Sequence, residues 1–317
     1  MVRQKLLRFK HKSIALLGFG YWGQIIYNIL SKKEYKLHFV ITSKSRLLES
    51  MGIDHIPVTN FEKSPLIKST THLFVISGPT FHHIALKKIM HDAEAKKNLK
   101  VWIEKPVFID YSRRKDEYKY LQDVFVDYIY TNQNADKNII GDIKKKEHDI
   151  IDIGIFSKNK YARDYSPIFD FAPHFLCIMH IITDQLKLAG ITDVKVEKIR
   201  NLEISCNEYV NRRNTFCYYF KTKCLITDIV FNVYIGSNLK RESFIACKNK
   251  KHPHKVIKSY KLKDVFELPV NNNIDMFLAD KEAFDKLPNT LNYNTEFHCL
   301  VYDFSSHLQK IIQSLEE

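Results

Sequence analysis

The chain has 317 residues, of which 45% are hydrophobic, and a formal net charge of +13 at pH 7. This length exceeds the usual size of a single hydrophobic core, so we expect two globular domains. The lysines are scattered along the chain, and their densest runs are not interleaved with aromatic residues in a stacking pattern, which argues against a nucleic-acid-binding protein. The sequence has no membrane-length apolar run and no signal-peptide core, so we expect a soluble, cytoplasmic protein with no membrane partner.

The six cysteines all lie in the second half of the chain, and no two of them form a Cys-x-x-Cys pair. Their spacing is typical of neither a zinc site nor a disulfide framework. We therefore expect free thiols in a reducing compartment and no bound metal.

An apolar strand, a glycine-rich turn and a helix follow one another near the N-terminus. Ile14–Leu17 predicts a buried parallel strand, Gly18-Phe19-Gly20-Tyr21-Trp22-Gly23 follows directly, and Gln24–Leu30 predicts a helix. A Gly-x-Gly-x-x-Gly turn in this context is the fingerprint of a dinucleotide-binding domain. An unrelated glycine-rich turn in an α/β protein is the alternative.

Each glycine of this turn has a separate physical role in such a domain. Gly18 allows the tight turn, Gly20 lets the backbone approach a pyrophosphate, and Gly23 lets the helix pack closely on the strand. The N-terminus of the helix presents backbone N–H groups and a partial positive charge to the phosphates.

The residues after the second predicted strand, Lys36–Ile41, bear on the choice of cofactor. An acidic residue there would bind the ribose 2′-hydroxyl of NAD, but this chain has Thr42-Ser43-Lys44-Ser45-Arg46 instead. Hydroxyl groups and cations suit the 2′-phosphate of NADP, so Ser43, Lys44 and Arg46 favour NADP over NAD. A solvent-exposed basic loop is the alternative.

Strands and helices alternate up to about residue 130. We expect strands at Ile56–Val58, His72–Ile76, Lys100–Ile103 and Val126–Tyr130, and helices at Leu47–Met51, Phe61–Lys68, Ile84–His91 and Asp110–Val124. This alternation predicts an α/β Rossmann domain with a doubly wound parallel sheet over residues 1–131.

Beyond this boundary the pattern changes to a run of strands. Ile150–Phe156 alternates, and further β patterns lie at Asp193–Cys206, Thr215–Lys221, Cys224–Ile235, Ser243–Cys247 and Val256–Leu262. Residues 132–317 are therefore predicted to form an α+β domain with an open, mainly antiparallel sheet. Helices are expected at Phe175–Ile182, Asp275–Leu287 and Thr295–Leu315.

Three motifs in order give the chain a resemblance to the Gfo/Idh/MocA family of nicotinamide-dependent oxidoreductases. The first is the Gly18–Gly23 turn, and the second is Gly78-Pro79-Thr80-Phe81-His82-His83, similar to the family's Thr-Pro-x-x-x-His turn with Gly78 in place of Thr. The third and most specific is Glu104-Lys105-Pro106, which ends a predicted buried strand. An ordinary charge pair before a turn is the alternative interpretation of this last motif.

The resemblance implies a function and a set of cofactor-binding residues. It implies hydride transfer between NADP or NAD and a hydroxyl or keto carbon of a sugar, cyclitol or sugar nucleotide, by a homo-oligomer (dimer or tetramer). The cofactor residues it implies, together with the loop after the second strand, are Gly18, Phe19, Gly20, Tyr21, Trp22, Gly23, Ser43, Lys44, Arg46, Gly78, Pro79, Thr80, His83, Glu104 and Lys105.

Asp170-Phe171-Ala172-Pro173-His174 matches the family's Asp-x-x-x-His motif. Asp170 and His174 share one face if the segment is helical, and Pro173 suits the first turn of a helix. His174 is then the general acid/base, Lys105 holds the substrate oxygen, and Asp170 binds substrate or tunes the other two. A capping Asp with a nearby structural histidine is the alternative.

Two other functions remain open at this point. One is a non-catalytic, NADP-sensing regulator with the same fold, although the presence of Lys105, Asp170 and His174 argues against it. The other is a small-substrate reductase of the biliverdin or imine type.

Overall fold

The computed structural model divides by its contacts into two compact units, residues 1–127 with 271–295 and residues 128–270 with 296–317. The structure describes residues 12–33, 35, 37–43, 45–57, 60, 70–79, 81–82, 85, 99–107, 124–127, 141, 150–157, 166–188, 209–212, 215–223, 230–237, 242–249, 251–262, 270–279 and 295–316. In this part of the chain, no helix is long and apolar enough to cross a membrane.

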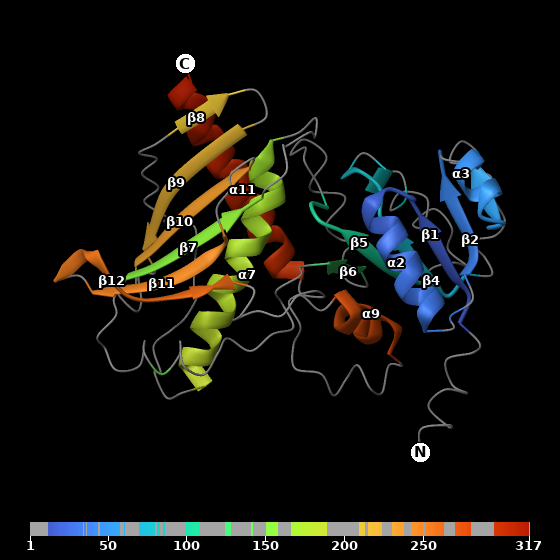
Figure 1. Ribbon diagram of the computed structural model, residues 1–317, viewed down its shortest axis with the longest axis horizontal. Coiled ribbons are helices and arrows are strands. Elements are labelled where there is room, and N and C mark those ends of the chain that lie inside the picture. The colour runs from blue at the N-terminus through green and yellow to red at the C-terminus, as the bar shows by residue number, and fades with distance from the viewer. Residues whose placement is uncertain are drawn as a thin grey trace. The chain divides into compact units, whose positions relative to one another are not determined.

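The first unit contains a six-stranded parallel sheet in the order β3-β2-β1-β4-β5-β6. Its strands are β1 (Ile14–Leu17), β2 (Leu37–Thr42), β3 (His55–Pro57), β4 (His72–Val75), β5 (Lys100–Glu104) and β6 (Val124–Asp127). This is the doubly wound order in which the chain changes direction between β1 and β4. The predicted Rossmann sheet is thereby confirmed (Figure 1).

Two helices with given bounds follow the first strands. α2 (Tyr21–Lys32) follows β1, and α3 (Ser45–Ser50) follows β2. The last strand differs from the prediction, because Val124 begins β6 where the end of a helix was expected. Val124, Phe125 and Val126 are all buried, as a strand covered on both faces requires. The helix predicted at Phe61–Lys68, residues 110–123 of the next one and most of Ile84–His91 lie outside the described residues.

Helix α9 (Val270–Leu278) belongs mainly to the first unit, whereas all of residues 132–317 were predicted to belong to the second domain. It also begins five residues before the predicted helix at Asp275. The buried Phe277 ring explains its position, since its centroid lies 4.9 Å from that of Phe74 and 5.5 Å from that of Trp102. Aromatic contacts of this kind join segments that are far apart in the sequence.

Polar contacts fasten the same helix. Lys33 at the end of α2 forms an ion pair with Asp275, and Lys100 Nζ donates to the Ala279 carbonyl at 2.8 Å. Lys12 Nζ donates to the Leu278 carbonyl. Two lysines thus bind carbonyls at the C-terminal end of α9, where positive charge also favours the helix dipole.

The second unit is built on a mixed sheet in the order β12-β11-β7-β10-β9-β8. Its strands are β7 (Ile150–Phe156), β8 (Tyr209–Arg212), β9 (Thr215–Lys223), β10 (Val230–Ser237), β11 (Phe244–Asn249) and β12 (His252–Lys261). Among the pairings of these described strands only β7–β10 is parallel, so the predicted open, mainly antiparallel sheet is confirmed. The strand expected at Asp193–Cys206 lies outside the described residues.

Helices α7 (Pro167–Leu188) and α11 (Thr295–Glu316) accompany this sheet (Figure 1). α7 contacts β7 and β10, and the isoleucines of β7 are buried. Phe175 of α7 meets Phe304 of α11 edge to face, with ring centroids 5.3 Å apart. This aromatic contact packs the two helices against each other.

α7 begins eight residues before the predicted Phe175. Ser166 precedes it, and the Ser166 Oγ accepts a hydrogen bond from the Ile168 N–H at 3.3 Å, while Pro167 occupies the first helical position. Serine at the cap followed by proline is a regular helix start. Pro173 is therefore inside the helix and not in its first turn, which corrects the prediction.

Candidate active site

The turn after β1 requires glycine at two positions for different reasons. Gly18 has φ +103°, and a Cβ there would lie 2.6 Å from the Ile76 carbonyl oxygen. At Gly23 a Cβ would lie 2.4 Å from the Gly18 carbonyl oxygen, because α2 passes directly over the turn. Both predicted structural roles, the tight turn and the close helix packing, are visible in this geometry.

Gly20 differs from its two neighbours because its surroundings are open. It is the N-cap of α2, with φ −74° and ψ −161°, and a Cβ on it would meet no atom of the described residues within 4 Å. Gly78, at the corresponding place after β4, is equally open. It accepts a hydrogen bond from the Phe81 N–H at 2.9 Å where the next helical segment begins.

A cavity of about 280 Å³ lies between these two turns. It is lined by Leu17, Gly18, Phe19, Gly20, Ile41, Thr42, Ser43, Ile76, Ser77, Gly78 and Phe81. These residues end β1, β2 and β4 or follow them, so the cavity opens at the carboxyl edge of the sheet where the strand order reverses. In open α/β sheets this is the position at which ligands bind.

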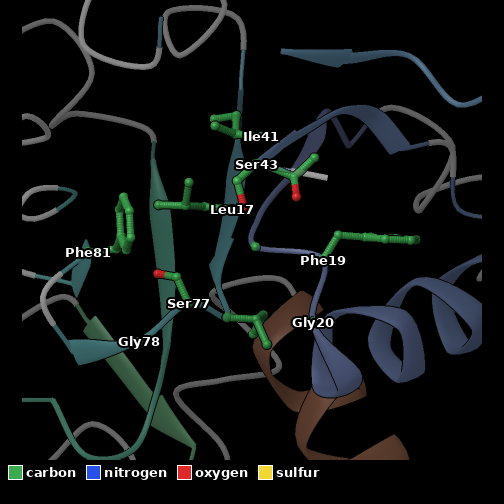
Figure 2. A pocket seen from close by; sticks show the side chains of 11 residues that line it. Leu17, Phe19, Gly20, Ile41, Ser43, Ser77, Gly78 and Phe81 are labelled. Carbon is green, nitrogen blue, oxygen red and sulfur yellow. The ribbon is translucent and has the colours of Figure 1, made fainter. Parts of the chain in front are cut away.

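The chemistry of the lining fits a ligand with both apolar and phosphate parts. The Ser77 Oγ is buried, and no described residue forms a hydrogen bond with it. Figure 2 shows Ser77 and the Phe81 ring on the same side of the cavity, while the Phe19 ring points away from them. Two glycine cradles, a helix N-terminus and an orphaned hydroxyl are a suitable donor set for a dinucleotide.

Some of the predicted cofactor residues line this cavity and others do not. Gly18, Phe19, Gly20, Ser43 and Gly78 line it. The Phe19 ring points away from the cavity (Figure 2) and is buried, with its centroid 5.6 Å from that of the Tyr27 ring of α2. The predicted residues Tyr21, Trp22, Gly23, Arg46, Pro79, Glu104 and Lys105 are not part of the lining, and Lys44, Thr80 and His83 lie outside the described residues.

The end of β2 presents the segment that was predicted to select the cofactor. Thr42 is buried and Ser43 is exposed at the cavity, while Arg46 lies in the first turn of α3. Among the described positions from 42 to 46 none is acidic, so the carboxylate that would bind a ribose 2′-hydroxyl is missing from them.

The Glu104-Lys105-Pro106 turn lies at the end of β5, two strands away from β1. Glu104 and Lys105 are only 7% and 8% exposed, and the Lys105–Pro106 peptide is cis. The buried His82 donates from Nδ1 to the Pro106 carbonyl at 3.1 Å, because a carbonyl oxygen can only accept. His82, for which no role was predicted, thus links the turn after β5 to the segment after β4 by a hydrogen bond.

Asp127, the last residue of β6, belongs to the same buried group, although it was not among the predicted site residues. It is paired in register with Glu104, is 3% exposed and accepts a hydrogen bond from Asn273 Nδ2 at 2.8 Å. Burial raises the pKa of Asp127 to about 6, against the opposing effects of Asn273, the Lys105 ammonium and a hydrogen bond with Glu104. The sequence signal for Asp127 was its place directly after the apolar run Val124-Phe125-Val126. No sequence pattern near Asn273 indicated that it belongs to this group.

Asp170 and His174 lie on α7 in the second unit. Asp170 is in the first turn and buried, and His174 is half-buried one turn later. The helix places both on one face, as predicted. Lys105 belongs to the first unit, so the convergence of these three residues stays a prediction. Ser77 and Phe81 were also missed as lining residues, although Ser77 directly precedes Gly78 and Phe81 follows three residues after it.

No protein-family model matches this sequence, and no curated protein sequence matches it. Solved structures do match in three dimensions. A dehydrogenase from Clostridium difficile matches with a TM-score of 0.59 at 14% identity, covering 96% of this chain and 100% of that one.

Two further structures carry more specific names. The UDP-N-acetylglucosamine 3-dehydrogenase from Acidithiobacillus ferrooxidans matches with a TM-score of 0.59 at 11% identity, over 94% of this chain and 96% of that one. The myo-inositol dehydrogenase from Lactobacillus casei, solved with NAD(H) and myo-inositol, matches with a TM-score of 0.59 at 10% identity, over 93% of this chain and 92% of that one. The chain therefore shares the fold of these dehydrogenase structures, as the resemblance described above implied.

Proposed function

We propose that this chain is a nicotinamide-dinucleotide-dependent oxidoreductase that acts on a hydroxyl or keto carbon of a sugar, cyclitol or sugar nucleotide. The observation that carries the proposal is the cavity between Gly20 and Gly78, with its open backbone and the orphaned Ser77 hydroxyl. The names of the structures with the same fold support the substrate class, since they include a sugar-nucleotide and an inositol dehydrogenase.

The residues of the first unit would hold the cofactor by its phosphates and ribose. The N-terminus of α2 and the backbone at Gly20 would face the pyrophosphate, and Ser77 would donate to a phosphate or ribose oxygen. The absence of an acidic residue at the described positions after β2, together with Ser43 and Arg46 in that segment, supports NADP as the preferred form.

The chemistry assigned to the protein is proton handling and charge stabilisation. Oxidation of an alcohol removes a hydride from carbon and a proton from oxygen, and a bound nicotinamide supplies the hydride acceptor or donor. The neutral imidazole of His174 would take the proton from the substrate hydroxyl, as imidazole can do near pH 7. Asp170, one helical turn away, would orient that imidazole or bind a neighbouring substrate hydroxyl.

Lys105 would supply the positive charge beside the reacting oxygen. It follows the last residue of β5 at the carboxyl edge of the sheet, where an ammonium can stabilise developing alkoxide character. In the reducing direction the same groups would return the proton to the oxygen. The hydrogen bond from His82 to the Pro106 carbonyl would hold the backbone next to Lys105 in place.

The test is a turnover screen of polyols, cyclitols, sugars and sugar nucleotides with NAD and with NADP, followed at the absorbance of the reduced nicotinamide. We expect turnover with at least one of these substrates, faster with NADP. Imines and bilins are included as a separate group, because turnover of these alone would show a small-substrate reductase. Tight NADP binding without any turnover would show a sensing protein and overturn the enzymatic proposal.

A further inference from the structure

Two carboxyl groups and one ammonium are buried together at the end of β5 and β6. Glu104 and Asp127 are paired in register on these neighbouring parallel strands, and their side chains are hydrogen-bonded. A hydrogen bond between two carboxyl groups requires a proton on one of them, because two carboxylates have only acceptors. Above the pKa of Asp127, the pair therefore holds one proton and one negative charge.

Lys105 supplies the matching positive charge. It directly follows Glu104, is 8% exposed, and its ammonium attracts the Asp127 carboxylate. An isolated charge is expensive to bury, whereas a single negative charge beside one ammonium is compensated. With one shared proton, the Glu104–Asp127 pair carries a single negative charge, which the single positive charge of Lys105 compensates.

Asn273 holds this group from a distant part of the sequence. Its Nδ2 donates to Asp127 Oδ1 at 2.8 Å, and both side chains are almost completely buried. It lies on α9, which Phe277 and Lys33 fasten to the same unit. Among the described residues, Glu104 of β5, Lys105 of the turn after it and Asn273 of α9 are the polar or charged groups that act on Asp127.

We propose that Asp127 is a positioning residue for Lys105, and that the proton-sharing Glu104–Asp127 pair, clamped by Asn273, provides the counter-charge that holds the Lys105 ammonium at the carboxyl edge of the sheet. The proposal rests on the reaction site proposed above. Asp127 acts through Lys105 and does not itself touch the substrate. Burial raises its pKa to about 6, so the counter-charge is complete above this pH and is lost as the pH falls through it.

The chain offers a matched control in its second sheet. Asp152 of β7 is also 3% exposed, accepts a hydrogen bond from Asn232 Nδ2 at 2.8 Å and forms an ion pair with Lys248. Asp152→Asn removes a buried carboxylate with the same kinds of partner, an asparagine and a lysine, outside the proposed site. It therefore reports the general effect of such a loss on the protein.

The first experiment uses the cofactor-free full chain, labelled with carbon-13 in aspartate and glutamate carboxyls and in the lysine side chain. We expect a carboxyl titration with a midpoint of about 6 that disappears in Asp127→Asn and moves to higher pH in Lys105→Met. The Lys105 resonance, assigned by its loss in Lys105→Met, should follow the same midpoint. It should lose that step in Asp127→Asn and keep it in Asp152→Asn.

The second experiment measures turnover on the substrate found in the screen. Asp127→Asn should lower kcat roughly 10- to 100-fold while KM changes less than about threefold, because a displaced Lys105 affects the reacting oxygen more than binding. Asp152→Asn should leave both constants near their wild-type values. An unchanged kcat in Asp127→Asn, or a midpoint that Lys105→Met does not move, would overturn the proposal. If the titrations behave as expected but the wild type turns over nothing, the enzymatic function fails and the coupled group stands.

Discussion

Gly20 permits a test that separates ligand binding from folding. The perturbation is Gly20→Val. Its backbone, at φ −74° and ψ −161°, suits any L-residue, and a Cβ meets no described atom within 4 Å. The cost to folding is the poorer N-cap, about 1 kcal/mol, offset in part by lower entropy of the unfolded chain. We expect a folded protein whose free energy of unfolding lies within about 1 kcal/mol of wild type.

The effect on binding should be much larger. The valine side chain would fill the cradle and keep the pyrophosphate from the N–H groups of α2. Loss of two charge-assisted hydrogen bonds, at about 1.5–3 kcal/mol each, corresponds to a dissociation constant raised on the order of 10²- to 10⁴-fold. Titration calorimetry with NADP and with NAD measures this loss, and circular dichroism with urea unfolding measures the stability.

Gly23→Ala is the matched contrast. Its Cβ would lie 2.4 Å from the Gly18 carbonyl oxygen, so turn and helix must move apart, which should cost roughly 1–3 kcal/mol of stability. A Gly20→Val protein that folds and binds both dinucleotides as tightly as wild type would refute the assignment of the cavity. A Gly23→Ala protein as stable as wild type would refute the proposed packing.

Three other variants, one of them with a matched control, test the remaining parts of the structure. Arg46→Ala should weaken NADP binding by about 1.5–3 kcal/mol with little effect on NAD; equal losses in calorimetry would contradict the cofactor preference. His174→Ala should lower kcat roughly 10²- to 10⁴-fold and leave the NADP affinity unchanged, whereas His180→Gln on the same helix should retain activity; full activity in His174→Ala would exclude it as the acid/base. Phe277→Ala should lower the free energy of unfolding by about 3–5 kcal/mol in urea denaturation, because a large buried ring is lost; a change below about 1 kcal/mol would show that α9 does not complete this core.

The first sheet could be predicted from the sequence because its strands are short apolar runs separated by strong turn signals. The Gly18–Gly23 turn was identifiable for the same reason, since strand, glycines and helix each carry a local signal. The limits of α7 were less accurate. The apolar pattern that begins at Phe175 is a stronger helix signal than the Ser166-Pro167 start. Pro173 resembles the first residue of a helix, although it lies inside α7.

The group around Asp127 could not be predicted in full, because it depends on register and on a distant helix. The strand was expected at Val126–Tyr130, which would have placed Asp127 near the start of a strand and not at its end. Asn273 was assigned to the second domain, and no local pattern links it to β6. Contacts of this kind arise from tertiary packing, which the local periodicity of hydrophobic residues does not predict.

The return of α9 to the first unit has a consequence for how the chain is made. Synthesis delivers β1 to β6 early, but Phe277 and the carbonyls that bind Lys12 and Lys100 leave the ribosome only after the strands of the second sheet. Until then Trp102 and Phe125 lack the ring that covers them in the finished structure. The first unit is therefore not formed by a continuous N-terminal segment that could fold completely by itself. A fragment ending near residue 131 would expose an aromatic surface and tend to aggregate, and the early half of a nascent chain would need protection until nearly the whole protein has emerged.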